Sequence, residues 1–178
     1  MLAADLQKPI IMREAGIQDL ERIMEMENAV FGSEAFSRRQ YRHLLQSATC
    51  RILLYESGTE LASMVVAGWR ARTDYLWIYS IAVSSRMRGQ GLGGRMLEEC
   101  LRMSRELQRR WVILEVRVSN ETAIHLYNKF GFEEVGFLAD YYGAGQDGLR
   151  MALEVKPAAC ARLTGEQSNQ NGVAGTST

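Results

Sequence analysis

The sequence predicts a mixed α/β sheet with flanking helices. Segments rich in β-branched and aromatic residues alternate with segments of helical periodicity along most of the chain. An early hairpin is indicated by two apolar runs, residues 51–55 and 61–69, separated by a turn that contains Gly58. A basic, glycine-rich loop at residues 84–94 lies between a predicted central strand and a long helical pattern. Together these features favour a single mixed sheet.

Length and charge limit the classes of protein to consider. The 178 residues fit one domain, which can bury a core without disulfides or metals. Lys and Arg total 21 and Asp and Glu total 21, so bulk charge gives no reason to expect nucleic acid or an anionic membrane as a partner. No apolar run approaches the ~20 residues that span a bilayer, and residues 1–10 lack the pattern of a secretory signal. We therefore expect a cytoplasmic protein.

The three cysteines carry little chemistry. Cys50, Cys100 and Cys160 are widely spaced and form no CxxC or Cys/His cluster. This pattern predicts neither a disulfide framework nor a zinc site, and reduced thiols in a cytosol fit it best. We expect no bound metal.

The remaining elements follow from periodicity and capping. Residues 9–15 are predicted as a first strand, and residues 17–31 have the apolar spacing of an amphipathic helix. Ser37 is a suitable N-cap for a second, short helix. Residues 75–83 are dense in aromatic and β-branched side chains, as a central strand would be. After the glycine-rich loop, the pattern predicts a long helix, a strand at 111–118, a helix at 120–130, and strands at 132–139 and 149–155.

Composition sets the boundaries of the domain. We expect one domain over residues 8–156. Residues 157–178 are mostly polar, aperiodic and rich in Gly, Ser, Thr and Asn, which is typical of a disordered tail.

The glycine-rich loop is the most informative motif. Glycine allows backbone N–H groups to approach a ligand closely, and consecutive amides at a helix N-terminus bind anions. Arg86 and Arg88 add positive charge beside those amides, so the loop suits a pyrophosphate; a turn without a ligand is the alternative. A Walker loop is excluded because Gly-Lys-Ser/Thr is absent. A Rossmann fingerprint fits the spacing to Glu115, but the mid-chain position counts against it.

The same loop resembles the acetyl-CoA signature Q/R-x-x-G-x-G/A of the GNAT superfamily of N-acetyltransferases. The match is complete over residues 88–93 and follows a strand that ends Ile-Ala-Val. Downstream, LEVRVSN at 114–120, AxxLY at 123–127 and GF at 131–132 resemble the ribosomal-protein-alanine N-acetyltransferase branch. The resemblance implies a central, mostly antiparallel sheet, an enzyme that uses acetyl-CoA, and the N-terminal amine of a protein as acceptor.

The resemblance also implies which residues bind acetyl-CoA. The backbone of Ile81, Ala82 and Val83 would pair with the pantetheine arm where this strand splays from its neighbour, and the Val83 amide would stabilise the thioester oxygen. Asn120, a good helix cap on any account, would add a cofactor contact. The pyrophosphate would be bound by Arg88, Gly89, Gln90, Gly91, Leu92, Gly93 and Gly94.

Glu115 and Tyr127 are the candidate catalytic residues. Glu115 lies in an apolar strand, where an acid needs a partner or a function, and an ion pair with Arg117 on the same face is the simplest structural explanation. Tyr127 lies on the buried stripe of its helix, as a core tyrosine would. The resemblance implies instead that Glu115 is the general base and Tyr127 the general acid that protonates the leaving thiolate.

The expected acceptor entrance departs from the resembled branch. Residues 31–41 and 139–146 would line it. The first segment contains Phe-Gly-Ser-Glu without the Pro-Trp that commonly follows the phenylalanine, and the second contains Gly-Ala-Gly. These departures concern acceptor specificity and leave the catalytic residues unaffected.

Two rival functions follow from the same residues. The first keeps the fold and takes a small amine, such as a polyamine, amino sugar or amino acid, in an acidic pocket built from Glu34, Asp140 and Asp147. The second is a non-catalytic module that binds acetyl-CoA and regulates a partner. The presence of both Glu115 and Tyr127 argues against the second, because a sensor needs neither a base nor an acid.

Overall fold

Within residues 9–156, the part of the chain that the computed structural model describes, seven strands form one sheet in the order β1-β2-β3-β4-β5-β7-β6. All neighbouring strands are antiparallel except β4 and β5, which are parallel. The expected tail at residues 157–178 lies outside the described residues. The strands are β1 (Ile10–Glu14), β2 (Cys50–Ser57), β3 (Glu60–Trp69), β4 (Tyr75–Val83), β5 (Trp111–Arg117), β6 (Glu133–Leu138) and β7 (Gly148–Glu154).

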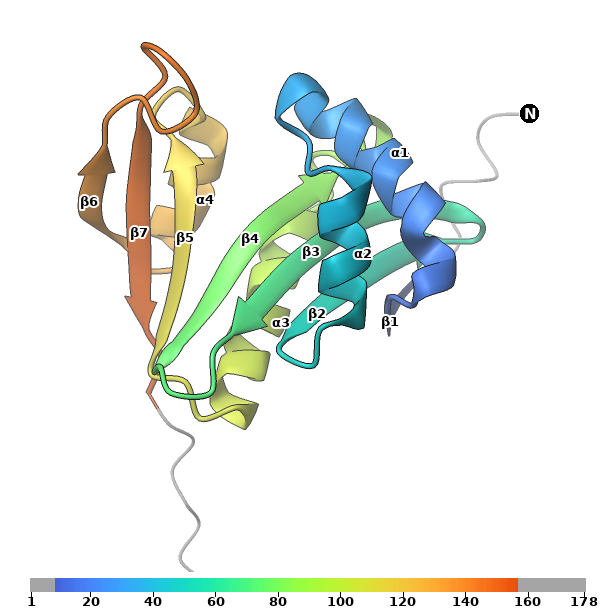
Figure 1. Cartoon of the computed structure of the whole chain (residues 1–178), viewed down its shortest axis with the longest axis horizontal. Helices are drawn as coiled ribbons and strands as arrows, with labels where there is room; N and C mark the ends of the chain where they lie inside the picture. The colour runs from blue at the N-terminus through green and yellow to red at the C-terminus, as the bar shows by residue number, and fades with distance from the viewer. Residues whose placement is uncertain (1–8, 157–178) are drawn as a thin grey trace, which may run out of the picture.

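Helices cover both faces of the sheet, as predicted (Figure 1). Helices α1 (Leu20–Phe31) and α2 (Arg38–Gln46) share one buried apolar cluster with the sheet. Helices α3 (Leu92–Glu106) and α4 (Glu121–Lys129) share a second cluster on the opposite face. In the described part of the chain, no helix is both long and apolar enough to cross a membrane. Single 3-10 turns lie at Ile17–Asp19, Gly32–Glu34 and Ser85–Met87.

Local interactions explain where α2 begins and where the β2–β3 hairpin turns. The Ser37 hydroxyl accepts a hydrogen bond from the Gln40 amide at 3.3 Å, and the Gln40 side chain accepts one from the Ser37 amide at 2.8 Å. This reciprocal capping box starts α2 at the residue that the sequence predicts. The β2–β3 hairpin turns at Gly58, which has a φ of +62° that favours glycine.

The central feature of the sheet is a fork between β4 and β5. The two strands pair only from Tyr75↔Trp111 to Ile78↔Leu114. Beyond that point β4 continues to pair with β3, and β5 continues to pair with β7, so the sheet divides into two halves. Figure 1 shows the two strands diverging toward their carboxyl ends. The splay that the GNAT resemblance implies is therefore present.

A β-bulge in β4 coincides with the fork. Val66 of β3 pairs with Ser80, and the next residue of β3, Ala67, pairs with Ile78, so Tyr79 has no partner on β3. A bulge bends its strand and increases its twist, which carries β4 away from β5 at the last paired residue. Gly68 makes room for this geometry, because a Cβ there would lie 2.6 Å from the Tyr79 ring.

The bulge also exchanges the faces of the residues that follow it. Before it, Leu76 and Ile78 point into the cluster under α3 and α4. After it, Ala82 belongs to the cluster under α1 and α2, and its neighbours Ile81 and Val83 pack toward α3 and α4. A regular strand would have kept residues of the same parity on one face.

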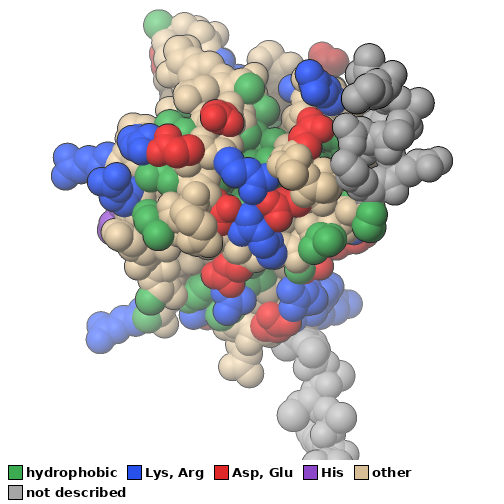
Figure 2. Space-filling view, turned by 90° about the vertical axis from the view of Figure 1, so that its right-hand side faces the viewer, with side chains coloured by type: hydrophobic (Ala, Val, Ile, Leu, Met, Phe, Trp, Pro, Cys, Tyr) green, Lys and Arg blue, Asp and Glu red, His purple; other side chains and the backbone are tan. Residues whose placement is uncertain are grey.

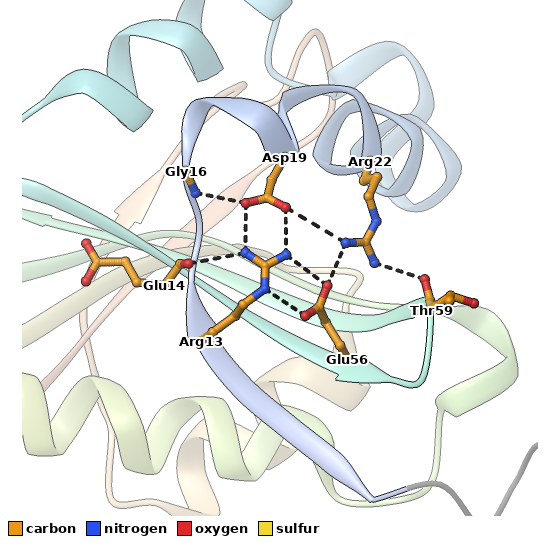
Figure 3. Close-up of polar contacts among 7 residues, drawn as sticks. All are labelled: Arg13, Glu14, Gly16, Asp19, Arg22, Glu56 and Thr59. Carbon is orange, nitrogen blue, oxygen red and sulfur yellow. Dashed lines mark hydrogen bonds and ion pairs between the residues drawn. The ribbon is translucent and has the colours of Figure 1, made fainter.

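A charged network joins the start of α1 to the sheet (Figure 3). Arg13 of β1 donates to both oxygens of Asp19, at 2.6 and 2.8 Å, and to both oxygens of Glu56, at 2.7 and 2.9 Å. Arg22 of α1 adds a bond to Glu56 at 2.6 Å and one to the carbonyl of Thr59 at 3.0 Å. Figure 2 shows basic and acidic side chains interspersed on this side of the molecule. The network fixes α1 over β1 and the β2–β3 hairpin.

The Arg13→Met substitution tests this network. It would leave the Asp19 carboxylate, only 5% exposed, without its main cation, and we expect the free energy of unfolding at pH 7 to fall by about 2 kcal/mol. Arg38→Met, which breaks an exposed pair with Glu21, should change it much less. Urea denaturation of both variants at pH 7 measures the difference.

The pH dependence gives a second check on the same variant. Hydrogen bonds from Arg13 hold the pKa of Asp19 and the pKa of Glu56 below their ordinary values of 3.8 and 4.5. Stability from a lowered carboxyl pKa is present above the ordinary value and is lost as pH falls. The gap between wild type and Arg13→Met should therefore shrink from pH 5 to pH 3. A gap that is constant over this range would contradict the network's role.

Candidate functional site

The glycine-rich loop has the backbone of an anion-binding site. Gly89 and Gly91 have φ values of +76° and +75°, and a Cβ at either position would meet nothing within 4 Å. Conformation, and not lack of space, therefore requires glycine at these two positions. The first i→i−4 bond of α3 runs from the Arg95 amide to the Gly91 carbonyl at 3.1 Å. The amides of the first turn before Arg95 have no partner within the helix, and the helix dipole adds to their positive potential.

Gly93 and Gly94 have a different structural reason. A Cβ at Gly93 would lie 3.1 Å from Leu126 Cδ2, and one at Gly94 would lie 3.5 Å from the Phe130 ring. Both partners lie at α4, so these glycines let α3 and α4 approach each other. The sequence motif thus combines two glycines that shape the loop with two that set the packing of the helices behind it.

Side chains of the loop point in several directions. Arg88 lines a cavity of about 320 Å³ that is bounded by α1, the β2–β3 turn and the start of the loop. Gln90 is held locally, because its amide nitrogen lies 3.7 Å from the sulfur of Met87. Leu92 is 2% exposed and packs into the core, so at this position only the backbone faces the loop.

The edge of β4 next to the loop has no strand partner on the side of β5. Ile81, Ala82 and Val83 pair with β3 on one side, in the register Val65↔Ile81, Met64↔Ala82 and Ser63↔Val83. On the other side the ladder with β5 has already ended. Backbone hydrogen-bonding groups on this edge are therefore free to bind an extended ligand.

Glu115 is held by two donors from neighbouring strands. The indole nitrogen of Trp77 in β4 donates to Oε2 at 3.0 Å, and Arg150 Nε in β7 donates to Oε1 at 3.1 Å. The Glu115 side chain is 11% exposed, so it lies in the sheet surface with limited access to solvent. Arg150 is its direct cross-strand neighbour in the β5–β7 ladder.

The structural pair that the sequence suggested for Glu115 is wrong. Arg117 lies two residues along the strand, but its guanidinium forms an ion pair with Glu34 and a hydrogen bond with Gln146. It also lies 4.6 Å from the ring centre of Tyr142. Residues directly opposite each other on neighbouring strands lie closer than residues two apart on one strand. Arg150 therefore occupies the place beside Glu115 that the sequence analysis gave to Arg117.

Helix α4 positions Tyr127. The helix begins at Asn120, whose Oδ1 accepts a hydrogen bond from the Ala123 amide at 3.2 Å, as its predicted role as a cap requires. Tyr127 is 9% exposed, and its ring centre lies 5.8 Å from that of Phe132. Burial, followed by the nearby Tyr142 phenol, raises the pKa of Tyr127 well above its usual range. Among residues 9–156, no hydrogen-bond partner is found for the Tyr127 hydroxyl.

Glu115 and Tyr127 approach β5 from opposite faces. Tyr127 belongs to the apolar cluster that includes Leu114 and Val116 of β5. Side chains alternate along a strand, so Glu115 points to the other face, where α1 and α2 cover the first half of the sheet. The unpaired edge of β4 lies between these two faces.

The face that carries Glu115 opens between two segments far apart in sequence. The Glu34–Arg117 ion pair joins the turn after α1 to the end of β5, and Tyr142 and Gln146 join the β6–β7 segment to the same guanidinium. On the same face, a pocket of about 160 Å³ is lined by Phe36, Gln40, His43, Leu44 and Tyr79. Phe36 and Gln40 belong to the first of the two segments that the sequence assigned to the acceptor entrance, and no residue of the second segment lines this pocket.

A buried carboxylate fixes the position of the first segment. Glu27 of α1 is 2% exposed and accepts hydrogen bonds from the Phe36 amide at 3.1 Å, the Tyr41 hydroxyl at 2.7 Å and the Ser80 hydroxyl at 3.4 Å. Burial raises the pKa of Glu27 above its ordinary value. These bonds tie α1, the connection to α2, α2 and β4 together, so the segment next to the opening has a fixed position.

Sequence analysis missed Trp77 and Arg150 as neighbours of Glu115, and Arg117 as the link between the two segments. Trp77 could have been suspected as a site residue from the sequence. Alternation along the central strand places Trp77 and Tyr79 on the same face. Arg150 carries no such signal, since the register of β5 against β7 depends on pairing across the helix α4 and the β6–β7 segment. Among the described residues, no group of three or more His, Cys, Asp or Glu side chains is arranged to hold a metal ion.

Comparisons with known proteins agree with this geometry. The model of the family described as acetyltransferase (GNAT) family matches residues 18–132. A candidate ribosomal protein bS18-alanine N-acetyltransferase of Bacillus subtilis (strain 168) is 32% identical over 145 residues, which are 81% of this chain and 95% of that protein. The N-alpha-acetyltransferase RimI of Mycobacterium tuberculosis is 29% identical over 79% of this chain and 89% of its own length.

Solved structures share the fold. The crystal structure of the ribosomal-protein-S18-alanine N-acetyltransferase from Escherichia coli superimposes with a TM-score of 0.77. The match covers 87% of this chain and 99% of that chain at 23% sequence identity. At this level of identity the likeness concerns the arrangement of the strands and helices.

Proposed function

The chain belongs to the acetyltransferase (GNAT) family, and from this we propose that it transfers the acetyl group of acetyl-CoA to the N-terminal α-amino group of a protein, such as a ribosomal protein. The observation that carries the proposal is the unpaired edge of β4, which runs from the fork to the anion-binding loop. Glu115 and Tyr127 lie on opposite faces of the adjoining strand. The acceptor class rests on the names of the relatives from B. subtilis and M. tuberculosis.

Acetyl-CoA fits the groups that line this edge. The free amides at the start of α3 suit its pyrophosphate, with Arg88 adding charge at the mouth of the loop. The pantetheine arm, which is extended and carries amides, would pair with the free backbone of residues 81–83. Asn120 at the start of α4 would contact the cofactor from the other side of the fork.

The chemistry requires three groups. The acceptor amine must be neutral to attack the thioester, and an α-amine with a pKa near 8 needs only a modest base, which Glu115 supplies directly or through one water. The amide of Val83 stabilises the thioester oxygen as negative charge develops on it. The amine nitrogen bonds to the carbonyl carbon, the C–S bond breaks and Tyr127 donates its proton to the departing thiolate. The attacking nitrogen loses its proton to solvent, and solvent returns a proton to Tyr127, giving the N-acetyl amide and CoA. A tyrosine with a raised pKa is protonated at neutral pH, as a general acid must be.

A small cationic acceptor is less well supported than a protein N-terminus. The carboxylates that would build its pocket are already engaged in local contacts. Glu34 is paired with Arg117, Asp140 accepts a hydrogen bond from the Gly145 amide at 2.5 Å, and Asp147 accepts one from the Asp140 amide at 2.9 Å. A polyamine would have to displace these contacts.

Release of free CoA from acetyl-CoA tests the proposed function. The purified protein is assayed with a peptide that begins with Ala, the same peptide with a blocked N-terminus and an internal Lys, a polyamine and an amino sugar. Turnover with the free Ala peptide alone is expected. Turnover only with the small amines would overturn the acceptor class, and binding of acetyl-CoA without turnover on any acceptor would favour a regulatory module.

The Glu115→Gln variant tests the base. Gln keeps the size of the side chain and one acceptor for the neighbouring donors, but it cannot take a proton. We expect kcat to fall about 100-fold or more while the Kd for acetyl-CoA stays within about twofold. Glu154→Gln is the matched control, because Glu154 of β7 also pairs with an arginine, Arg110 at 2.8 Å, at the far end of the same ladder. Equal rates for the two variants would remove Glu115 from the mechanism.

The Tyr127→Phe variant separates catalysis from packing. The hydroxyl has no bonding partner among the described residues, so its loss should change the free energy of unfolding by less than about 0.5 kcal/mol. The rate of CoA release should nevertheless fall strongly. Tyr41→Phe is the contrasting control, because its hydroxyl bonds Glu27 at 2.7 Å and its loss should destabilise by about 1–2 kcal/mol. An active Tyr127→Phe enzyme would contradict the assignment of the acid.

The Gly91→Glu variant tests the loop. A carboxylate beside the free amides repels the pyrophosphate, and a side chain at a φ of +75° strains the turn. We expect the affinity for acetyl-CoA to fall beyond detection in calorimetry. Gly145→Glu is matched, since Gly145 also has a positive φ, +71°, with open space around it, and it should bind acetyl-CoA normally. Normal binding by Gly91→Glu would refute the pyrophosphate site.

A further inference from the structure

We propose that Trp77 and Arg150 are positioning residues that hold the Glu115 carboxylate in its working orientation, an inference that rests on the proposed function of Glu115 as the base. They touch Glu115 and act through it. Each binds a different oxygen, Trp77 at 3.0 Å and Arg150 at 3.1 Å. A carboxylate bound on both oxygens can turn neither about its long axis nor away from the sheet.

The two donors come from the strands on either side of β5. Trp77 pairs with Ile113 one residue before the last pair of the β4–β5 ladder, and its indole reaches across the fork to Glu115. Arg150 reaches Glu115 from β7, and its guanidinium also lies 5.5 Å from the centre of the Trp77 ring. The three side chains therefore form a closed cluster in which each contacts the other two.

The position of the cluster distinguishes it from an ordinary structural ion pair. It lies where backbone pairing between β4 and β5 ends, so the side chain of Glu115 is the first group of β5 that faces the opening. Only two of the roughly four lone-pair positions on the carboxylate are used, and the remainder can accept a proton or a hydrogen bond from an amine or water. The two donors thus fix the orientation of the carboxylate and leave lone pairs for an amine or water.

The surroundings of Glu115 make Arg150 the main charged group that faces it. The other titratable groups with an electrostatic effect involving Glu115 are three phenols, Tyr79 from β4 and Tyr141 and Tyr142 from the β6–β7 segment. Burial raises the pKa of each of these tyrosines, and that of Tyr142 to about 12, so all three are neutral at physiological pH. Arg150 is therefore the cation that holds the Glu115 carboxylate in place.

The test uses Trp77→Phe, which removes the indole donor and keeps an aromatic ring under Arg150. With an Ala-starting peptide and saturating acetyl-CoA, we expect kcat to fall about tenfold, because a loosened carboxylate is less often in a productive orientation. The loss should fall on kcat and leave the KM for the peptide near its wild-type value, because the base loses its orientation while the surfaces that bind the substrates stay in place. The Kd for acetyl-CoA and the Tm should stay near wild-type values.

Arg150 and a control variant complete the series. Arg150→Met should lower kcat without raising the KM for the peptide, and Arg150→Lys should restore part of the rate, since a cation near Oε1 returns. Trp111→Phe is the matched control, because Trp111 also lies on this sheet face beneath an arginine, Arg110 at 5.7 Å, and at the opposite end of β5 from the fork. It should leave kcat unchanged.

A double-mutant cycle makes the inference falsifiable apart from the proposed function. In the Glu115→Gln background, Trp77→Phe should have no further effect on kcat, since Trp77 acts only through the carboxylate. A full additional loss in that background would overturn the positioning role, and so would a lower Tm with an unchanged kcat. If Glu115→Gln alone retains full activity, the base assignment fails instead. If Glu115→Gln is slow and Trp77→Phe is not, the positioning role alone fails.

Discussion

The β-bulge at Tyr79 is the constraint on which the site depends. It bends β4 at the last residue that pairs with β5, and it exchanges the faces of the residues that follow, so that Ala82 points under α1 and Val83 points toward α3. Beyond it the β4–β5 ladder has ended, so the backbone groups on this edge of β4 have no strand partner and could bind a ligand. The Tyr79 ring needs the space that Gly68 leaves free, so the fork is encoded by two residues on adjacent strands.

A sheet divided in this way needs other contacts to keep its halves in register. On the face of α3 and α4, Gly93 and Gly94 let the two helices pack closely, one behind each half. On the opposite face, side chains cross the fork, with Trp77 bonded to Glu115 at its base and Glu34 paired with Arg117 near its mouth. The polar groups that cross the fork therefore hold the two halves of the site in position.

The sequence allowed the elements and the loop to be predicted, because their causes are local. The signals used were strand alternation, the Ser37 cap and the glycines of the loop. Each of them depends only on residues a few positions away in the sequence. It did not allow the partner of Glu115 to be predicted, since Arg150 is brought there by the β5–β7 register across 35 residues of chain. Arg117 was misassigned for the same reason, as its partner Glu34 lies in the turn after α1, 83 residues away in sequence. Period-2 alternation also fails after Tyr79, where one unpaired residue reverses it.

Glu115 and Tyr127 lie on opposite faces of the sheet, and this arrangement explains why the proposed reaction needs the fork. A strand places alternate side chains on opposite faces, so Glu115 on β5 and Tyr127 packed behind it are separated by the sheet itself. They can act on one acetyl group only if that group lies in the plane of the sheet, between them. An intact β4–β5 ladder would fill that plane with backbone hydrogen bonds, whereas the forked ladder leaves it open. In the proposed reaction the amine would arrive at the face of Glu115 and the thiolate would leave toward Tyr127, so each proton transfer would take place on its own side of the sheet.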